Sequence, residues 1–206
     1  ESQELLLNEV NHRVKNNLYS LTGMLYKEKD KILKTKSKKD TIFIDDLISR
    51  IDGLAKVHNL LSASKWKPLN LSVLVNELTY NYFKNSLSEE LNVNVKKHQK
   101  EMVNSYQAQH FALVYNEILT NIVKYCGINL DDLNINCKIT SNKDYIFVRI
   151  RDNGVGFNKK ILSGDYSEAG IGFDLIFGIL KKSLAGSVEI ENNNGAVYKL
   201  KFKKRI

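Results

Sequence analysis

The 206-residue chain is poor in cysteine and proline and has no long apolar run. Its only cysteines, Cys126 and Cys137, cannot form a disulfide framework and lack metal-site spacing, which indicates a reducing compartment. No stretch approaches the roughly 18 apolar residues of a membrane-spanning helix, and no signal-peptide pattern opens the chain. We expect a cytoplasmic chain that belongs to a longer protein, because it begins inside a predicted helix. Whether that longer protein is attached to a membrane stays open.

Acidic residues are in deficit, with 23 Asp and Glu against 31 Lys and Arg, so the formal net charge is +8. Such a charge raises nucleic acid as a partner. The lysines, however, crowd at 27–39 and 199–205 without interleaved aromatic platforms for bases. We therefore interpret them as solvated lysines and expect no nucleic-acid partner.

Proline occurs once, at Pro68, where the helical pattern breaks, and we place a domain boundary there between 1–66 and 67–206. In the first part, apolar residues recur every three or four positions over 7–25 and 44–61. This spacing predicts two helices in an antiparallel hairpin. A single hairpin buries little apolar surface. We therefore expect a second copy to pack against it and form a dimeric four-helix bundle.

His12 lies on the side of the first predicted helix opposite its apolar stripe, near Glu9 and Asn16. A histidine kept for packing would lie on the stripe, as His58 does on the second helix. We therefore expect His12 to be exposed for a function and His58 to be packed.

The part 67–206 alternates between helical and strand patterns. Helices are predicted near 71–85, 107–126 and 173–185, and strands near 91–97, 133–140, 144–151 and in a final hairpin over 187–202. This order predicts an α+β sandwich, in which helices cover one mostly antiparallel sheet.

Three features of this second part point to a nucleotide, and the first is a polar strip on the helix "FALVYNEILTNIVKYC". Glu117, Asn121 and Lys124 fall within a narrow arc of an otherwise apolar surface. An Asn can coordinate Mg²⁺, a Glu can hold a ligating water, and a Lys can pair with phosphate. A solvent-facing seam explains the strip equally well.

The second feature is "VRIRDNGVGF". Apolar residues alternate over 146–150, and the same alternation carries Asp152 to the inner side, where an adenine amino group could donate to it. Gly154 and Gly156 permit a tight turn and leave room for a base. The alternative is an ordinary Asp-Asn-Gly turn of a hairpin.

The third feature is "AGIGFDLIFGILKKSLAG", in which Gly170 and Gly172 lead into an amphipathic helix. Free N–H groups at such a helix start favour phosphate. The segment is neither a Walker motif nor a good dinucleotide-binding motif.

In order and spacing, "NEILTNIVKY", "DNGVGF", "GIGFDL" and "NNGAVYKLKF" resemble the N, G1 and G2 boxes of the GHKL ATPase fold of sensor histidine kinases. The segments "NHRVKNNL" and "RIDGLAKVHNLLSASKW" resemble the phosphoacceptor hairpin of the His-Arg-x-Lys-Asn type, related to the HWE kinases. The resemblance implies autophosphorylation from ATP with Mg²⁺. It further implies phosphotransfer to a response regulator receiver domain, a homodimer and an upstream sensor domain.

The resemblance also implies residue roles in the hairpin. His12 is the expected phosphoacceptor, and Asn16 is expected to assist dephosphorylation of the bound regulator. Arg13 stands where many histidine kinases carry an acidic residue, which leaves Glu9 as the nearest carboxylate on that face.

In the second part, the resemblance implies Glu117 as a catalytic residue and Glu117 and Asn121 as metal ligands. The nucleotide-binding residues that it implies are Asn121, Lys124, Tyr125, Asp152, Gly154, Gly156, Gly170 and Gly172.

Two other functions fit part of the pattern. The chain could be a kinase-like scaffold that has lost catalysis. Asn121 and Asp152 are present at the motif positions, however, which argues against such a loss. It could also be a GHKL ATPase of another kind, in which Glu117 would activate water and nothing would require His12. Asn116 replaces the N-box histidine of the HWE group, so the broader His-Arg-x-Lys-Asn class fits better.

Overall fold

A computed structural model describes residues 14, 17, 18, 20–27, 29, 32, 38–63, 65, 67–83, 92–96, 101–166 and 171–205. The chain divides into two compact units, Glu1–Trp66 and Lys67–Ile206. Within the described parts of both units, no helix combines the length and apolar character needed to cross a membrane.

The first unit is helical in its described parts. Residues 20–27 are helical, and α2 spans Lys38–Ala63. The Thr22 hydroxyl donates to the Asp52 carboxylate of α2 over 3.2 Å, which joins two helical segments far apart in sequence, as in a hairpin. His58 is buried, as predicted for a packed histidine. His12, Glu9 and Asn16 lie outside the described residues.

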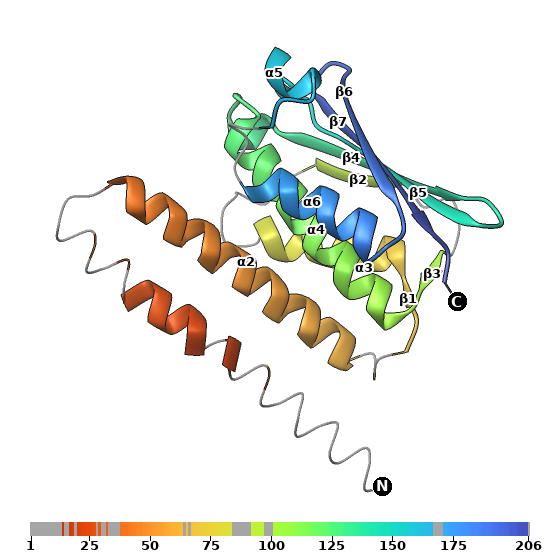
Figure 1. Cartoon of the computed structure of the whole chain (residues 1–206), viewed down its shortest axis with the longest axis horizontal. Coiled ribbons are helices and arrows are strands. Elements are labelled where there is room, and N and C mark those ends of the chain that lie inside the picture. The colour runs from red at the N-terminus through yellow and green to blue at the C-terminus, as the bar shows by residue number, and fades with distance from the viewer. Residues whose placement is uncertain are drawn as a thin grey trace, which may run out of the picture. The chain divides into compact units, whose positions relative to one another are not determined.

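The second unit contains helices and strands in the predicted order (Figure 1). The long elements agree with the predictions to within a few residues. The two short strands, η1 and α5 were not predicted, because two to four residues are too few for a periodic pattern. The elements are β1 (Leu69–Asn70), α3 (Leu71–Phe83), β2 (Asn92–Lys96), β3 (Met102–Val103), α4 (Ser105–Tyr125), η1 (Leu130–Asp132), β4 (Asn134–Ser141), β5 (Tyr145–Arg151), α5 (Lys159–Leu162), α6 (Ile171–Lys182), β6 (Ser187–Asn192) and β7 (Ala196–Lys203).

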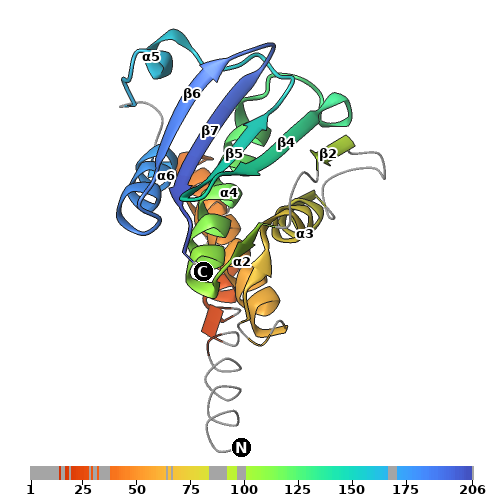
Figure 2. The same cartoon turned by 90° about the vertical axis from the view of Figure 1, so that its right-hand side faces the viewer.

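The main sheet has five strands in the order β2-β4-β5-β7-β6. β2 pairs parallel with β4 and the other neighbours pair antiparallel, which confirms a mostly antiparallel sheet. Helices α3, α4 and α6 lie together on one side of it (Figures 1 and 2). Alternate residues of β5, namely Ile146, Val148 and Ile150, are buried as predicted, because they face this helical layer.

The start of α4 is tied to the end of β7. The Asn104 carboxamide caps the helix by accepting from the Gln107 backbone N–H over 2.9 Å, and its Nδ2 donates to the Arg205 carbonyl. The Gln107 side chain in turn donates to the Lys203 carbonyl over 2.7 Å. These bonds link the first turn of α4 to the chain end that follows the sheet.

A buried carboxylate lies between β3 and the end of β4. Glu101 accepts from the Ser141 hydroxyl over 2.6 Å and pairs with the Lys204 ammonium at 3.0 Å. Burial alone would raise the pKa of the Glu101 carboxyl. The hydrogen bonds from Ser141 and Lys204, with the charge of Lys204, outweigh burial and hold this pKa below its ordinary value.

We predict that Glu101→Gln lowers the free energy of unfolding by roughly 1.5–3 kcal/mol at neutral pH, because charge-assisted hydrogen bonds are lost. A lowered folded-state pKa stabilises the fold above the unfolded value of 4.5 and ceases to do so as the pH falls through the folded value. Urea unfolding at several pH values should therefore show the difference between wild type and variant shrinking in acid. Glu77→Gln, at an exposed position of α3, is the control, and a pH-independent difference would contradict the prediction.

Candidate functional site

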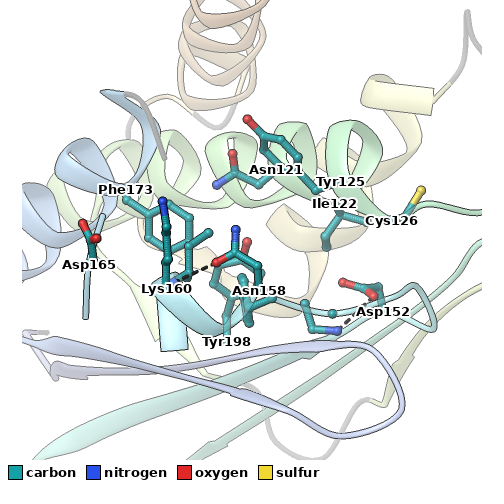
Figure 3. Close-up of a pocket in the computed structure, with 14 residues that line it drawn as sticks. Asn121, Ile122, Tyr125, Cys126, Asp152, Asn158, Lys160, Asp165, Phe173 and Tyr198 are labelled. Carbon is teal, nitrogen blue, oxygen red and sulfur yellow. Dashed lines mark hydrogen bonds between the residues drawn. The ribbon is translucent and has the colours of Figure 1, made fainter. Parts of the chain in front are cut away.

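A cavity of about 290 Å³ lies between the C-terminal half of α4 and the sheet (Figure 3). Figure 3 shows Asn121 and Tyr125 on the helix side, with Asp152 and Tyr198 on the sheet side. The cavity is lined by Asn121, Ile122, Tyr125, Cys126, Asp152, Gly156, Phe157, Asn158, Lys160, Ile161, Asp165, Phe173, Ala196 and Tyr198. It thus gathers residues from all three segments that the sequence singled out.

Asp152 follows directly after β5 and is buried, with 3% of its surface exposed. Its Oδ1 accepts from the Gly154 backbone N–H over 2.7 Å and from the Ala196 backbone N–H over 3.1 Å. Its other oxygen has no hydrogen-bond partner among the described residues. Asp152 lines the cavity, so this oxygen can accept a hydrogen bond from a ligand bound there.

The glycines after Asp152 form a tight turn that packs closely against its neighbours. A Cβ on Gly154 would clash with the Cys126 carbonyl, which accepts from the Val155 backbone N–H over 2.8 Å. Gly156 has a φ of +80°, and a Cβ there would lie 2.7 Å from Oδ1 of Asn192. On the side where a Cβ would lie, the space beside both glycines is thus filled by the protein, while Gly156 also lines the cavity.

Asn192, at the end of β6, holds the same turn in place. Its Oδ1 accepts from the Phe157 backbone N–H over 2.8 Å, and its Nδ2 donates to the Phe157 carbonyl over 2.9 Å. One side chain thus satisfies both backbone groups of a residue that lines the cavity. No local sequence pattern marks Asn192, because the contact joins residues 35 positions apart.

Aromatic rings form one wall of the cavity. The Phe157 ring packs edge-on against Tyr198 at 5.1 Å and against Phe173 at 6.1 Å, and Tyr166 stacks on Phe173 at 5.3 Å. Burial raises the pKa of the Tyr198 phenol above its ordinary value, which the Asn121 side chain partly offsets. The phenol therefore stays neutral, and the wall is suited to packing a flat, uncharged ring system.

Glu117 and Asn121 meet α6 at the other end of the cavity region. Both are buried, which rules out the solvent-facing seam for these two residues. A Cβ on Gly172 would lie 3.2 Å from a Glu117 carboxylate oxygen and 3.5 Å from the Asn121 amide oxygen, so a larger residue at 172 would press against the Glu117 side chain. The Nδ2 of Asn121 is buried without a hydrogen-bond partner among the described residues.

This pair of oxygens fits Mg²⁺, which binds proteins through one or two oxygen ligands and takes the rest from water and phosphate. Within the described ranges, no group of three or more His, Cys, Asp or Glu side chains could hold a metal ion.

Lys124 and Gly170 are the two remaining predicted nucleotide-binding residues. Lys124 is exposed and does not line the cavity, and Gly170 lies outside the described residues. The structure adds Asn158, Lys160 and Asp165, which belong to α5 and its flanks. These three lie after the glycine turn, in a stretch with no motif that sequence reasoning could have used.

Comparisons with known protein families agree with this geometry. Residues 9–86 match the family described as histidine kinase, and residues 106–206 match the family described as histidine kinase-, DNA gyrase B-, and HSP90-like ATPase. The chain belongs to the histidine kinases. It is a protein-histidine kinase, and the ATPase family matched by residues 106–206 implies that it binds ATP.

Solved histidine kinases share this fold. The histidine kinase domain of the blue-light activated kinase of Erythrobacter litoralis EL346 matches 97% of this chain and 91% of its own length, with a TM-score of 0.63 and 17% identity. Histidine kinase AdeS of Acinetobacter baumannii matches 89% of this chain and 95% of its own, with a TM-score of 0.56 and 12% identity.

Histidine kinase ThkA, in complex with response regulator protein TrrA, matches 97% of this chain and 61% of its own, with a TM-score of 0.56 and 18% identity. Among curated proteins, comparison finds no significant match. Identities this low show the fold alone.

We predict that Asn192→Ala weakens ATP binding several-fold, because the Phe157 backbone loses two hydrogen bonds, each worth about 0.5–1.5 kcal/mol. Isothermal titration with ATP measures the effect. Asn193→Ala is the matched control, since its side chain makes no hydrogen bond within the described part of the chain. Equal ATP affinities in the two variants would show that Asn192 does not position the cavity wall.

Proposed function

We propose that this histidine kinase binds Mg·ATP in the cavity, phosphorylates itself on His12 and passes the phosphoryl group to an aspartate of a response regulator. The unpaired oxygen of buried Asp152 carries the nucleotide assignment. An adenine amino group is a donor of the required kind, and the neighbouring aromatic wall suits a purine ring.

The triphosphate extends from the adenine end toward Glu117, Asn121 and Gly172. Asn121 can donate to phosphate through its Nδ2, and Asn121 and Glu117 are the residues that would hold Mg²⁺. Mg²⁺, when bound there, would neutralise phosphate charge. The first turn of a helix has no internal acceptors for its backbone N–H groups, so those of α6 can donate to phosphate.

In the transfer step, an imidazole nitrogen of His12 forms a bond to the γ-phosphorus, and the bond from that phosphorus to the β–γ bridging oxygen breaks. ADP leaves with the electron pair, and the imidazole proton passes to a base, for which Glu9 is our candidate. The protein contributes chiefly positioning and electrostatic stabilisation, as in other phosphoryl transfers.

The partners follow from the family. A response regulator accompanies the related kinase ThkA in its complex, and we propose a receiver domain as the acceptor here. We also propose that the first unit, 1–66, is the dimerisation and phosphotransfer hairpin, that the second, 67–206, is the catalytic domain, and that an upstream sensor domain controls both. Asn16, four residues after His12, is proposed to orient a water during dephosphorylation of the regulator.

We predict that Asp152→Asn weakens ATP binding by roughly 1.5–3 kcal/mol, because the amino group of adenine loses a charged acceptor. Calorimetry measures the affinity. Asp144→Asn removes an equal charge from an exposed turn and should bind ATP like the wild type. Unchanged affinity in Asp152→Asn would place the nucleotide elsewhere.

We predict that His12→Gln binds ATP normally but takes up no label from γ-labelled ATP, because the phosphoacceptor is absent. In the wild type, the label should be acid-labile and base-stable, as expected of phosphohistidine. His110→Gln, on α4, should be labelled fully. Label that persists in His12→Gln would contradict the assignment, and ATP hydrolysis without any labelled protein would favour an ATPase of another kind.

A further inference from the structure

The sheet has a second face, opposite α3, α4 and α6, on which no described segment of Lys67–Ile206 packs (Figures 1 and 2). We call this the open face. It consists of the alternate residues of β4, β5, β7 and β6 that point away from the buried layer. Its charged members are Lys138, Arg149, Arg151, Lys199, Lys201, Lys203, Glu189 and Glu191.

Strand register gathers these cations from separate parts of the sequence. Lys138 of β4 pairs with Arg149 of β5, which pairs with Lys199 of β7. Neighbouring strands lie about 4.8 Å apart, and alternate residues of one strand about 6.8 Å apart. The side chains of Lys201 and Lys203 extend the array along β7, so the cations form a continuous grid.

Acidic side chains neutralise only part of this grid. Glu191 pairs with Lys199 at 2.6 Å and reaches Arg149 at 3.9 Å. No described carboxylate pairs with the other four cations, which are Lys138, Arg151, Lys201 and Lys203. The open face therefore has excess positive charge that faces solvent.

The rings on the open face do not suit base stacking or a protein partner. The Lys201 ammonium lies 4.3 Å from the centre of the Tyr145 ring and so occupies one of its faces. Tyr145 and Phe147 are only partly exposed, and no large hydrophobic side chain on the described open face is well exposed. Protein interfaces usually need such apolar anchors at their centre, whereas a charged lipid surface needs none.

We propose that the open face binds an anionic lipid surface through its unpaired cations. A broad grid of lysines and arginines can contact many headgroups at once. This surface lies on the other side of the sheet from the ATP cavity, so lipid and nucleotide do not compete.

Binding of the whole chain to phosphatidylcholine vesicles, with or without phosphatidylserine, tests the proposal by flotation at low salt. We expect binding only with phosphatidylserine, and loss of it at high salt because the charges are screened. Each cation near such a surface is worth about a fivefold change in partitioning, so Lys138→Gln/Lys201→Gln/Lys203→Gln should lower it about a hundredfold.

The matched control is Lys159→Gln/Lys181→Gln/Lys182→Gln, which removes the same charge from exposed positions on α5 and α6. It should bind like the wild type, and thermal unfolding and ATP titration should show both variants folded. If both variants lost vesicle binding equally, net charge alone would explain the binding, and the proposal would be overturned. Absence of binding to phosphatidylserine vesicles would overturn it, as would preferential binding of single-stranded DNA that the open-face substitutions abolish.

Discussion

The cavity depends on one buried carboxylate, Asp152, which is held by backbone groups and keeps one oxygen without a partner among the described residues. Burying a charge is unfavourable unless donors surround it. The N–H groups of Gly154 and Ala196 supply two donors to one oxygen, from the turn after β5 and from the start of β7. The protein thus leaves one oxygen of this carboxylate able to accept a hydrogen bond from a ligand, and the adenine amino group is our proposed donor.

The turns on both sides of Asp152 contain glycines that pack closely against neighbouring backbone. Gly195 passes so close to the Asp152 backbone that a Cβ there would overlap its carbonyl oxygen, which brings the Ala196 N–H to the carboxylate. On the other side, Gly154 lies against Cys126 at the end of α4. The turn thus joins the C-terminal end of α4, the helix that carries Asn121, to the sheet.

Several features were predictable because they rest on periodicity. Alternation over β5 carried Asp152 to the buried side, and the apolar stripe of α4 predicted a long helix. The polar strip on that helix could not be interpreted from spacing alone. Glu117 and Asn121 are buried beside Gly172, while Lys124, on the same predicted arc, is exposed. Only the packing of α6 separates them.

By itself, the sequence determined the order of elements, the mostly antiparallel sheet, and the family through the spacing of its motifs, because these depend on local periodicity and on residue type. Tertiary structure alone decided what the glycines accommodate, which rings form the wall, and that Asn192 holds Phe157. It also placed Lys199, Lys201 and Lys203, which in the sequence resemble a solvated tail, on the same face of the sheet as Lys138, Arg149 and Arg151. Strand register and helix packing bring together residues tens of positions apart, and no local pattern records those pairings.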